Sequence, residues 1–104
     1  MPVLVGHLTQ EEMQWLITSY FPEEFHSWAL SVSLCESTWY TWAENDHSTA
    51  AGLWQFLRST WDWVAGETGT GSYASGAVFN AYAQALNASW LVQNGGKQHW
   101  VCKA

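Results

Sequence analysis

Residues 22–37 read PEEFHSWALSVSLCES, which is the pattern of a helix buried along one side. The stretch opens with a proline and two glutamates. These suit a first helical turn, because proline has no amide to leave unpaired and acidic groups favour the positive end of the helix dipole. Apolar side chains then recur at helical spacing: Phe25, Trp28, Ala29, Val32 and Cys35. We therefore predict a helix from Pro22 to about residue 36.

A helix is also expected before this stretch, over residues 9–20. Thr9 and Glu12 form a capping box, in which the hydroxyl and the carboxylate satisfy amides at the helix start. Pro22 separates this helix from the next one. The predicted buried face of the helix over residues 9–20 follows the i, i+3, i+4, i+7 pattern and comprises Met13, Leu16, Ile17 and Tyr20.

Two further helices are predicted in the second half of the chain. The first spans residues 53–65, where Ser59 and Asp62 give a capping signal and Gly66 ends the helix. The second spans residues 78–93 and ends before a glycine pair. Its predicted buried face comprises Val78, Tyr82, Ala85, Leu86 and Ser89.

The remaining segments are predicted to be loops. Residues 37–50 have no regular period and are rich in Ser, Thr and Asn, while residues 66–77 are rich in glycine. No segment shows the alternation of a β-strand. The fold class is therefore mainly α, in a single domain over residues 1–104 with its core at about residues 9–103.

The composition argues against several classes of partner. The net charge is −6 with three basic residues, whereas nucleic acids and anionic membranes both require clustered Lys and Arg. No apolar run reaches the length of about 18 residues that a membrane span needs. The four histidines are scattered without ligand spacing, so we predict no metal and no cofactor. We expect a monomer.

The ends of the chain and its cysteines bear on location. Residues 1–6 have no basic region and are too short for a secretory signal. We therefore expect an extracellular or cell-wall location, reached by another route or after removal of a signal, or a phage origin. Cys35 and Cys102 form no CxxC motif. By spacing alone they are either one disulfide that closes most of the domain or two unrelated buried thiols.

Glu36 differs from the other acidic residues because it continues the apolar stripe at the end of a predicted helix. An isolated carboxylate there is costly to ionise, so it favours the protonated form that a general acid must hold near neutral pH. The negative end of the helix dipole acts in the same direction. Position alone leaves open a helix-end glutamate that simply reaches solvent.

The segment after Glu36 mixes aromatic and polar residues in a way that suits a sugar site. Ring faces stack on sugar rings, and amides and hydroxyls bind sugar hydroxyl and N-acetyl groups. The predicted substrate contacts are Trp39, Trp42, Asn45, Ser48, Thr49, Trp54 and Gln55. The tryptophans expected in the core are Trp15, Trp28, Trp61 and Trp90.

Three motifs in order resemble the lysozyme-like soluble lytic transglycosylases, especially the compact actinobacterial and phage members such as resuscitation-promoting factor domains. Cys35-Glu36-Ser37 matches the family's ES pair, residues 51–56 (AGLWQF) match its GLxQ segment, and Ser59-Thr60-Trp61 matches its STW. The resemblance covers roughly residues 9–103. The chain departs from the family pattern at Trp54, Arg58 and Gln84.

The resemblance implies a small α-rich, lysozyme-like domain with a sugar-binding groove. It implies that Glu36 is the catalytic acid and base, that Gln55 lies near it in the groove, and that Cys35 pairs with Cys102. Tyr82 corresponds to a tyrosine of the family's third motif and is expected to contact substrate.

The implied activity is cleavage of peptidoglycan glycan strands between N-acetylmuramic acid and N-acetylglucosamine. In a lytic transglycosylase the muramic 6-hydroxyl attacks, whereas in a lysozyme water attacks with help from a second carboxylate. The absence of a clear partner favours the transglycosylase; the candidates are Glu44, Asp46, Asp62 and Glu67. The alternatives from other classes are a non-catalytic module that binds peptidoglycan or chitooligosaccharides, and a structural piece of a phage tail.

Overall fold

The computed structural model describes residues 2–102. Lys103, the last residue of the predicted core, lies outside the described residues, as do Met1 and Ala104. Between residues 2 and 102 the chain forms four α-helices, short 3-10 turns and isolated β-bridges but no strand, which confirms the mainly α class. The helices are α1 (Gln10–Tyr20), α2 (His26–Ser37), α3 (Arg58–Thr68) and α4 (Ala81–Gln93). The 3-10 turns are η1 (Glu23–Phe25), η2 (Tyr73–Ser75), η3 (Ala77–Phe79) and η4 (Lys97–His99).

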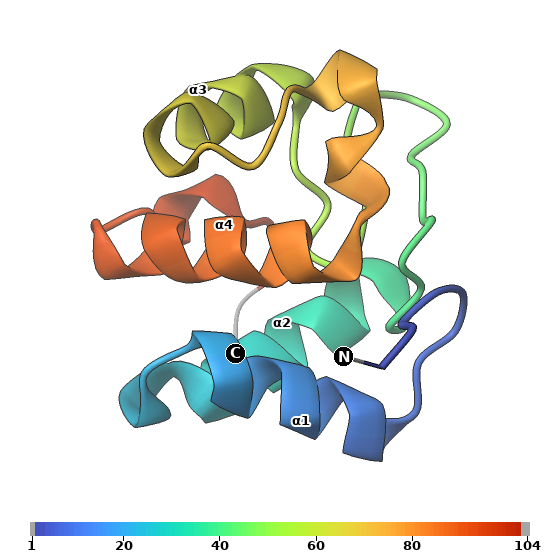
Figure 1. The fold of residues 1–104 in the computed structure, drawn as a ribbon, viewed down its shortest axis with the longest axis vertical. Helices are drawn as coiled ribbons and strands as arrows, with labels where there is room; N and C mark the ends of the chain where they lie inside the picture. The colour runs from blue at the N-terminus through green and yellow to red at the C-terminus, as the bar shows by residue number, and fades with distance from the viewer. Residues whose placement is uncertain (1, 103–104) are drawn as a thin grey trace.

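Helix α4 is the central element: it lies between α3 and α1, and α1 packs in turn against α2 (Figure 1). With neighbours on both sides, α4 is buried around most of its circumference, and its small side chains allow close approach. The single buried face predicted for it was partly wrong, since Leu86 is exposed and Tyr82 half-buried. The helix also begins later than predicted, because the Asn80 side chain caps it by accepting a hydrogen bond from the Ala83 amide.

The first two helices follow the sequence pattern closely. Both hydrogen bonds of the capping box between Thr9 and Glu12 are formed at the start of α1. The helix predicted from Pro22 is divided into η1 and α2, because a tighter 3-10 turn precedes the α-helical geometry. Cys35 is exposed and does not belong to the buried face of α2.

Helix α3 corrects two of the predicted signals. Ser59 is not its N-cap and Gly66 does not end it, since the helix begins at Arg58 and passes through Gly66. A distant residue caps the start: the Thr49 hydroxyl accepts a hydrogen bond from the Arg58 amide at 2.9 Å. The helix ends at Gly69, which takes the left-handed conformation that glycine adopts without steric cost.

Two tryptophans are misplaced by the sequence prediction. Trp54, expected at the substrate, is 0% exposed, and its indole nitrogen donates to the Ala29 carbonyl oxygen. It belongs to a turn over residues 52–55, followed by a β-bridge at Phe56, and these replace the predicted start of a helix. Trp15, expected in the core, is 41% exposed. The other core predictions are confirmed for Trp28 and Trp61, which are buried, while Trp90 is half-buried.

The segment before α1 contributes to the core as well. Leu4 and Leu8 are buried, so the core begins before residue 9. The segment is held by the Gly6 amide, which donates to the Thr41 hydroxyl at 2.7 Å, and by the Thr41 amide, which donates to the Gly6 carbonyl oxygen at 3.0 Å. It therefore lies against the chain that follows α2.

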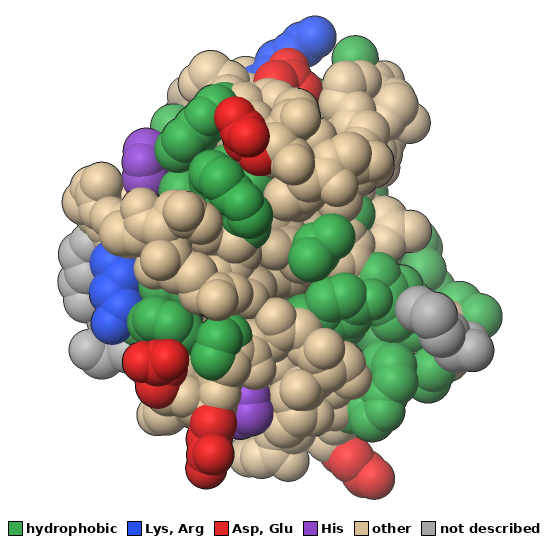
Figure 2. Space-filling view, turned by 60° about the vertical axis from the view of Figure 1, so that its left-hand side comes forward, with side chains coloured by type: hydrophobic (Ala, Val, Ile, Leu, Met, Phe, Trp, Pro, Cys, Tyr) green, Lys and Arg blue, Asp and Glu red, His purple; other side chains and the backbone are tan. Residues whose placement is uncertain are grey.

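The described surface carries little positive charge. Basic side chains visible in Figure 2 lie apart from one another and form no patch. Arg58 lies over the ring of Tyr73, and Lys97 lies near the rings of Phe25 and Trp28. None of the helices between residues 2 and 102 combines the length and hydrophobicity that crossing a bilayer requires.

Candidate active site

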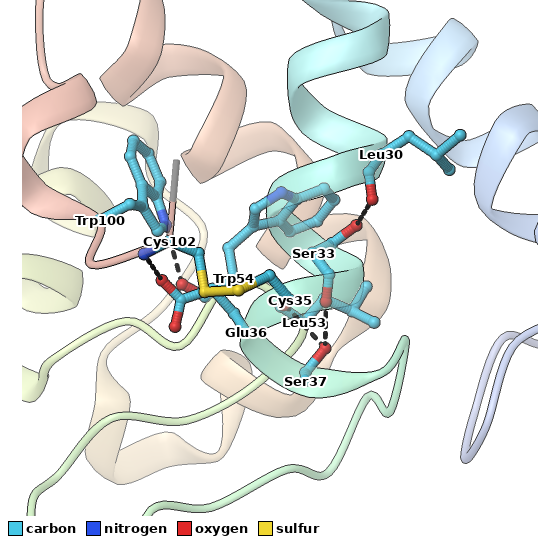
Figure 3. The surroundings of a disulfide bond; sticks show 9 residues. All are labelled: Leu30, Ser33, Cys35, Glu36, Ser37, Leu53, Trp54, Trp100 and Cys102. Atoms are coloured by element: carbon cyan, nitrogen blue, oxygen red, sulfur yellow. Dashed lines mark hydrogen bonds between the residues drawn. A yellow bond between two sulfur atoms is a disulfide. The ribbon is translucent and has the colours of Figure 1, made fainter. Parts of the chain in front are cut away.

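Glu36 is the second-last residue of α2 and is half-buried. Helix α2 ends beside it because Thr38 takes a left-handed conformation, with its amide still donating to the Leu34 carbonyl oxygen. The Glu36 carboxylate accepts a hydrogen bond from the Cys102 amide, with 3.2 Å between Oε2 and N (Figure 3). Within residues 2–102 this amide is its one hydrogen-bond partner. The carboxylate is therefore neither a buried ion pair nor a fully solvated surface group.

A disulfide joins Cys35, the neighbour of Glu36, to Cys102 in the C-terminal tail, with 6.0 Å between their Cα atoms. The pairing implied by the family resemblance is thus confirmed. Trp100 anchors the same tail, because it is buried and its indole nitrogen donates to the Trp54 carbonyl oxygen at 2.8 Å. Both anchors hold the tail beside the end of α2.

Backbone strain occurs shortly after Glu36 and again at Gln55. Among the described residues, the non-glycine positions with positive φ are Thr38 at 53°, Trp39 at 61° and Gln55 at 51°. A left-handed conformation costs a side-chain-bearing residue about 1–2 kcal/mol, most for a β-branched or bulky one. Strain of this kind persists only where the surrounding structure enforces it, and it is common at functional sites. Two of these residues follow Glu36 closely, and the third belongs to the predicted GLxQ segment.

Side chains enforce this backbone by bonding the peptide groups of Leu53. The Ser37 hydroxyl lies 2.8 Å from the Leu53 carbonyl oxygen and 3.0 Å from that of Ser33. The Leu53 amide donates to Gln84 Oε1 at 2.8 Å, and Gln84 Nε2 donates to the Thr41 carbonyl oxygen at 3.0 Å. Gln84 is fully buried. Helix α4 thereby ties together the two segments that flank the candidate site.

Gln84 is a residue whose part in this site the sequence did not predict, apart from its departure from the family pattern. The available signal was a long polar side chain among alanines on a buried helix. Gly52 fits against it closely: a Cβ on Gly52 would lie 2.9 Å from Gln84 Cδ. Glycine is therefore required there both by its φ of 84° and by this approach.

Gln55 is half-buried at the turn after Leu53. Its carboxamide nitrogen donates to the carbonyl oxygens of Gly52 at 3.0 Å and Ala43 at 3.2 Å. The side chain is held across the turn in this way. Within residues 2–102 no donor reaches its carboxamide oxygen, which can accept a hydrogen bond from a ligand.

The polar residues predicted to bind sugar partly serve their own loop. The side-chain oxygen of Asn45 accepts from the His47 amide and that of Ser48 from the Ala50 amide, which are local turn bonds. Thr49 caps α3, as described above. All three are exposed, so the hydroxyl protons and the Asn45 amide group remain directed to solvent or ligand. The loop is thus ordered by the residues that the sequence assigned to substrate.

Of the three tryptophans predicted near substrate, Trp42 is the one on the open surface, at 48% exposed. It lines a hollow of about 240 Å³ together with Glu44 and Phe79. Trp39 is half-buried, and its indole nitrogen donates to the Ser33 hydroxyl and the Leu30 carbonyl oxygen. Trp39 therefore packs inward, and Trp42 is left as the available stacking surface.

Tyr82 belongs to a different cluster. Its ring contacts Trp15 and Tyr20, and its hydroxyl donates to the Pro2 carbonyl oxygen. Two effects raise the pKa of the Tyr82 hydroxyl above its ordinary value: the larger is loss of hydration, and the smaller is the charge interaction with Tyr20. The hydroxyl is therefore neutral. These contacts join Tyr82 to α1 and to the N-terminal segment, and none of them involves Glu36 or Gln55.

The candidate second carboxylates differ in their surroundings. Asp62 accepts a hydrogen bond from the Tyr73 amide at 2.7 Å and so holds η2. Glu44, Asp46 and Glu67 are exposed, and of these Glu44 lines the hollow beside Trp42. Glu44 is therefore the candidate carboxylate that shares a hollow with an exposed tryptophan.

Other surface features lie elsewhere. A hollow of about 450 Å³ lies between α1 and α2 and contains no residue predicted for the site; it is lined by Gln14, Ile17, Thr18, His26, Ser27 and Leu30. Size alone does not make it the active site, because it holds no carboxylate. The described residues contain no group of His, Cys, Asp or Glu that could hold a metal ion.

Comparison with known proteins adds no relative. No protein-family model, curated protein or solved structure matches this chain. The resemblance to soluble lytic transglycosylases therefore rests on the sequence motifs alone.

Proposed function

We propose that this protein cleaves peptidoglycan glycan strands between N-acetylmuramic acid and N-acetylglucosamine, with Glu36 as the general acid and base. The observation that carries the proposal is the half-buried Glu36 carboxylate, oriented by a single amide beside strained backbone at Thr38 and Trp39. The proposal includes a lysozyme-like fold with a groove past Glu36, and action outside the cell or on behalf of a phage.

In the proposed reaction the protonated Glu36 donates its proton to the glycosidic oxygen, and the bond to the muramic C1 breaks through an oxocarbenium-like transition state. The ionised Glu36 then takes the proton of the muramic 6-hydroxyl, whose oxygen attacks C1. The products are a 1,6-anhydro sugar and a free 4-hydroxyl. The Gln55 oxygen and the Trp42 ring provide polar and stacking contacts to the glycan.

Hydrolysis by a lysozyme-type reaction is the second candidate, and Glu44 is the observation that favours it. This carboxylate lines the same hollow as Trp42 and Phe79, so a sugar stacked on the Trp42 ring would lie beside it. Under the transglycosylase proposal, Glu44→Gln keeps the product unchanged. A switch from water-added products to anhydro products, or loss of cleavage, in that variant would instead support hydrolysis.

The non-catalytic alternative, a module that only binds the wall, is supported by the exposure of Trp42. The two ideas separate in one assay with dye-labelled sacculi. The proposal predicts soluble dye-labelled fragments that increase with time and with protein concentration. Retention of the protein on the sacculi without fragment release would contradict cleavage and would favour the binding module.

A further inference from the structure

The disulfide and the Glu36 carboxylate meet at the same residue, Cys102. Its sulfur is bonded to Cys35, next to Glu36 in the chain, and its amide donates to Glu36 Oε2 (Figure 3). The cross-link and the hydrogen bond together join two consecutive residues of α2 to one residue of the tail. A disulfide that only cross-linked the chain would not require the additional hydrogen bond to Glu36.

The position of that amide depends on the disulfide. On its N-terminal side the tail is anchored by Trp100, through burial and the hydrogen bond to Trp54. Val101 between the anchors is 91% exposed and contributes no packing. The disulfide is therefore what brings the Cys102 amide back against the end of α2.

Glu36 needs such an orienting group. A glutamate side chain has several rotatable bonds, and a general acid must lie within hydrogen-bond reach of the oxygen it protonates. The Cys102 amide is the one partner that restricts this carboxylate within residues 2–102. A hydrogen bond to a charged group is among the stronger protein hydrogen bonds, so its loss has a measurable effect.

We propose that Cys102 is a positioning residue of this site: the disulfide holds its amide on the Glu36 carboxylate, and opening the disulfide slows glycan cleavage while leaving glycan binding intact. This inference rests on the proposed function. The contacts assigned to glycan binding, at Trp42 and Gln55, belong to residues 42–55 and not to the tail.

The inference makes cleavage sensitive to thiol reductants. A dithiol gives two electrons and two protons to the S–S bond, which becomes two thiols, and the dithiol itself becomes a disulfide. Cys35 is exposed and Cys102 half-buried, so a small dithiol can reach the bond. The disulfide would then hold the Cys102 amide on the Glu36 carboxylate only in an oxidising compartment.

The first test compares oxidised protein, dithiol-reduced protein and the double variant Cys35→Ser/Cys102→Ser on soluble glycan strands. We expect kcat to fall on the order of tenfold in the last two, with KM changed less than about twofold. Val101→Ala is the matched control in the tail and should retain full kcat. Circular dichroism reports whether each form is folded. Unchanged kcat in folded, reduced protein would overturn the inference.

Where loss of the disulfide unfolds the chain, an ester in place of the Val101–Cys102 amide keeps the cross-link and removes only the N–H donor. Semisynthesis of the tail gives this variant. The same drop in kcat is expected at unchanged KM. An ester variant with full kcat would show that the amide has no positioning role.

A spectroscopic measurement tests the contact independently of any activity. In oxidised protein the Cys102 amide proton resonance should move as the pH is raised through the range where carboxyl groups ionise, and Glu36→Gln should abolish the movement. Glu36→Gln is also the control for other titrating groups, because any movement that they cause persists in this variant. A resonance that stays fixed in the parent protein would refute the contact. If the contact is present but the protein cleaves no glycan, the proposed function fails and the role of Cys102 in cleavage fails with it. If the protein cleaves glycan at the same rate with the disulfide open, only the inference fails.

Discussion

The C-terminal ends of α2 and α3 have similar sequences and geometry, but the left-handed residue that follows each helix is of a different type. Each helix has a glutamate second from its end, Glu36 in α2 and Glu67 in α3, and each is followed by a residue in left-handed conformation. In α3 that residue is Gly69, as steric cost dictates. In α2 it is Thr38, and the next residue, Trp39, is left-handed too.

The two helix ends show where the fold accepts strain. The loop after α3 places its positive φ angles on glycines, and Glu67 is exposed to solvent. The loop after α2 places them on side-chain-bearing residues, and Glu36 is half-buried against the Cys102 amide. Strain of about 1–3 kcal/mol per residue persists when other interactions enforce it. The end of α2 therefore has the features of a site, and the end of α3 those of a connection.

The largest expected difference between the two helix ends concerns their glutamates. Glu36→Gln should reduce fragment release from sacculi on the order of 10³-fold, because the amide cannot donate the proton that the leaving oxygen needs. Glu67→Gln is the matched change at the other helix end and should leave the rate within about twofold. Equal rates for the two variants would remove Glu36 from the reaction.

The next largest effect is on stability, and it should differ between two buried carboxamide side chains of α4. Gln84 bonds the backbone at Leu53 and Thr41, whereas Asn87 bonds the hydroxyls of Thr68 and Thr70 at the end of α3. Gln84→Leu leaves two backbone groups unpaired and should lower the free energy of unfolding by about 2–4 kcal/mol.

Asn87→Leu should cost less, about 1–2 kcal/mol, because threonine hydroxyls can turn toward water. Urea denaturation measures both values. At a temperature where both variants are folded, Gln84→Leu should also lose cleavage activity while Asn87→Leu keeps it. Loss of activity in neither variant would mean that the backbone held by Gln84 is not part of the site.

Substituting the left-handed residue after each helix should change the free energy of unfolding slightly and with opposite sign. Gly69→Ala should lower the free energy of unfolding by about 1 kcal/mol, for backbone reasons alone, since a Cβ there meets no atom within 4 Å. Thr38→Gly should raise it by up to about 1 kcal/mol, because the strain is relieved. Thermal unfolding compares the two. Destabilisation by Thr38→Gly would show that its side chain contributes more than its backbone strain costs.

The smallest expected effect is that of salt. The protein has a net charge of −6, and its basic groups form no visible patch in Figure 2, so attraction to the wall does not rest on positive charge. Binding to sacculi should change less than about twofold as the ionic strength rises from low values to about 0.15 M. Co-sedimentation measures the binding. A steep loss of binding with added salt would show that ionic interactions with the wall contribute to it.

Local signals were sufficient for much of the fold. The capping box of Thr9 and Glu12 and the apolar periodicity of α1 and α2 depend on residues three or four apart, so the sequence predicts them well. The limits of α3 were predicted wrongly because its cap, Thr49, is nine residues from Arg58. A capping signal at Ser59 competes with that distant bond, and sequence spacing cannot rank them.

The site was predictable in part for the same reason. Glu36 and Gln55 were predicted as site residues from motifs, but the contact between Glu36 and Cys102 spans 66 positions and has no local signal. Trp54 was misplaced because aromatic spacing does not say which side of an irregular turn faces the core. Trp15 was misplaced for another reason, since it lies in α1 beside the buried face formed by Met13, Leu16 and Ile17 and does not belong to that face. Gln84 was noted as a departure, and its role depends on contacts 31 and 43 positions away.

Mass spectrometry of sacculi digested with the parent protein and with Glu36→Gln tests the central proposal most directly. The parent protein should release muropeptides ending in 1,6-anhydro-muramic acid, each lighter by one water than the hydrolytic product, and Glu36→Gln should release none. Absence of new fragments with the parent protein, or the same fragments with both, would contradict the proposal that Glu36 cleaves the glycan strand.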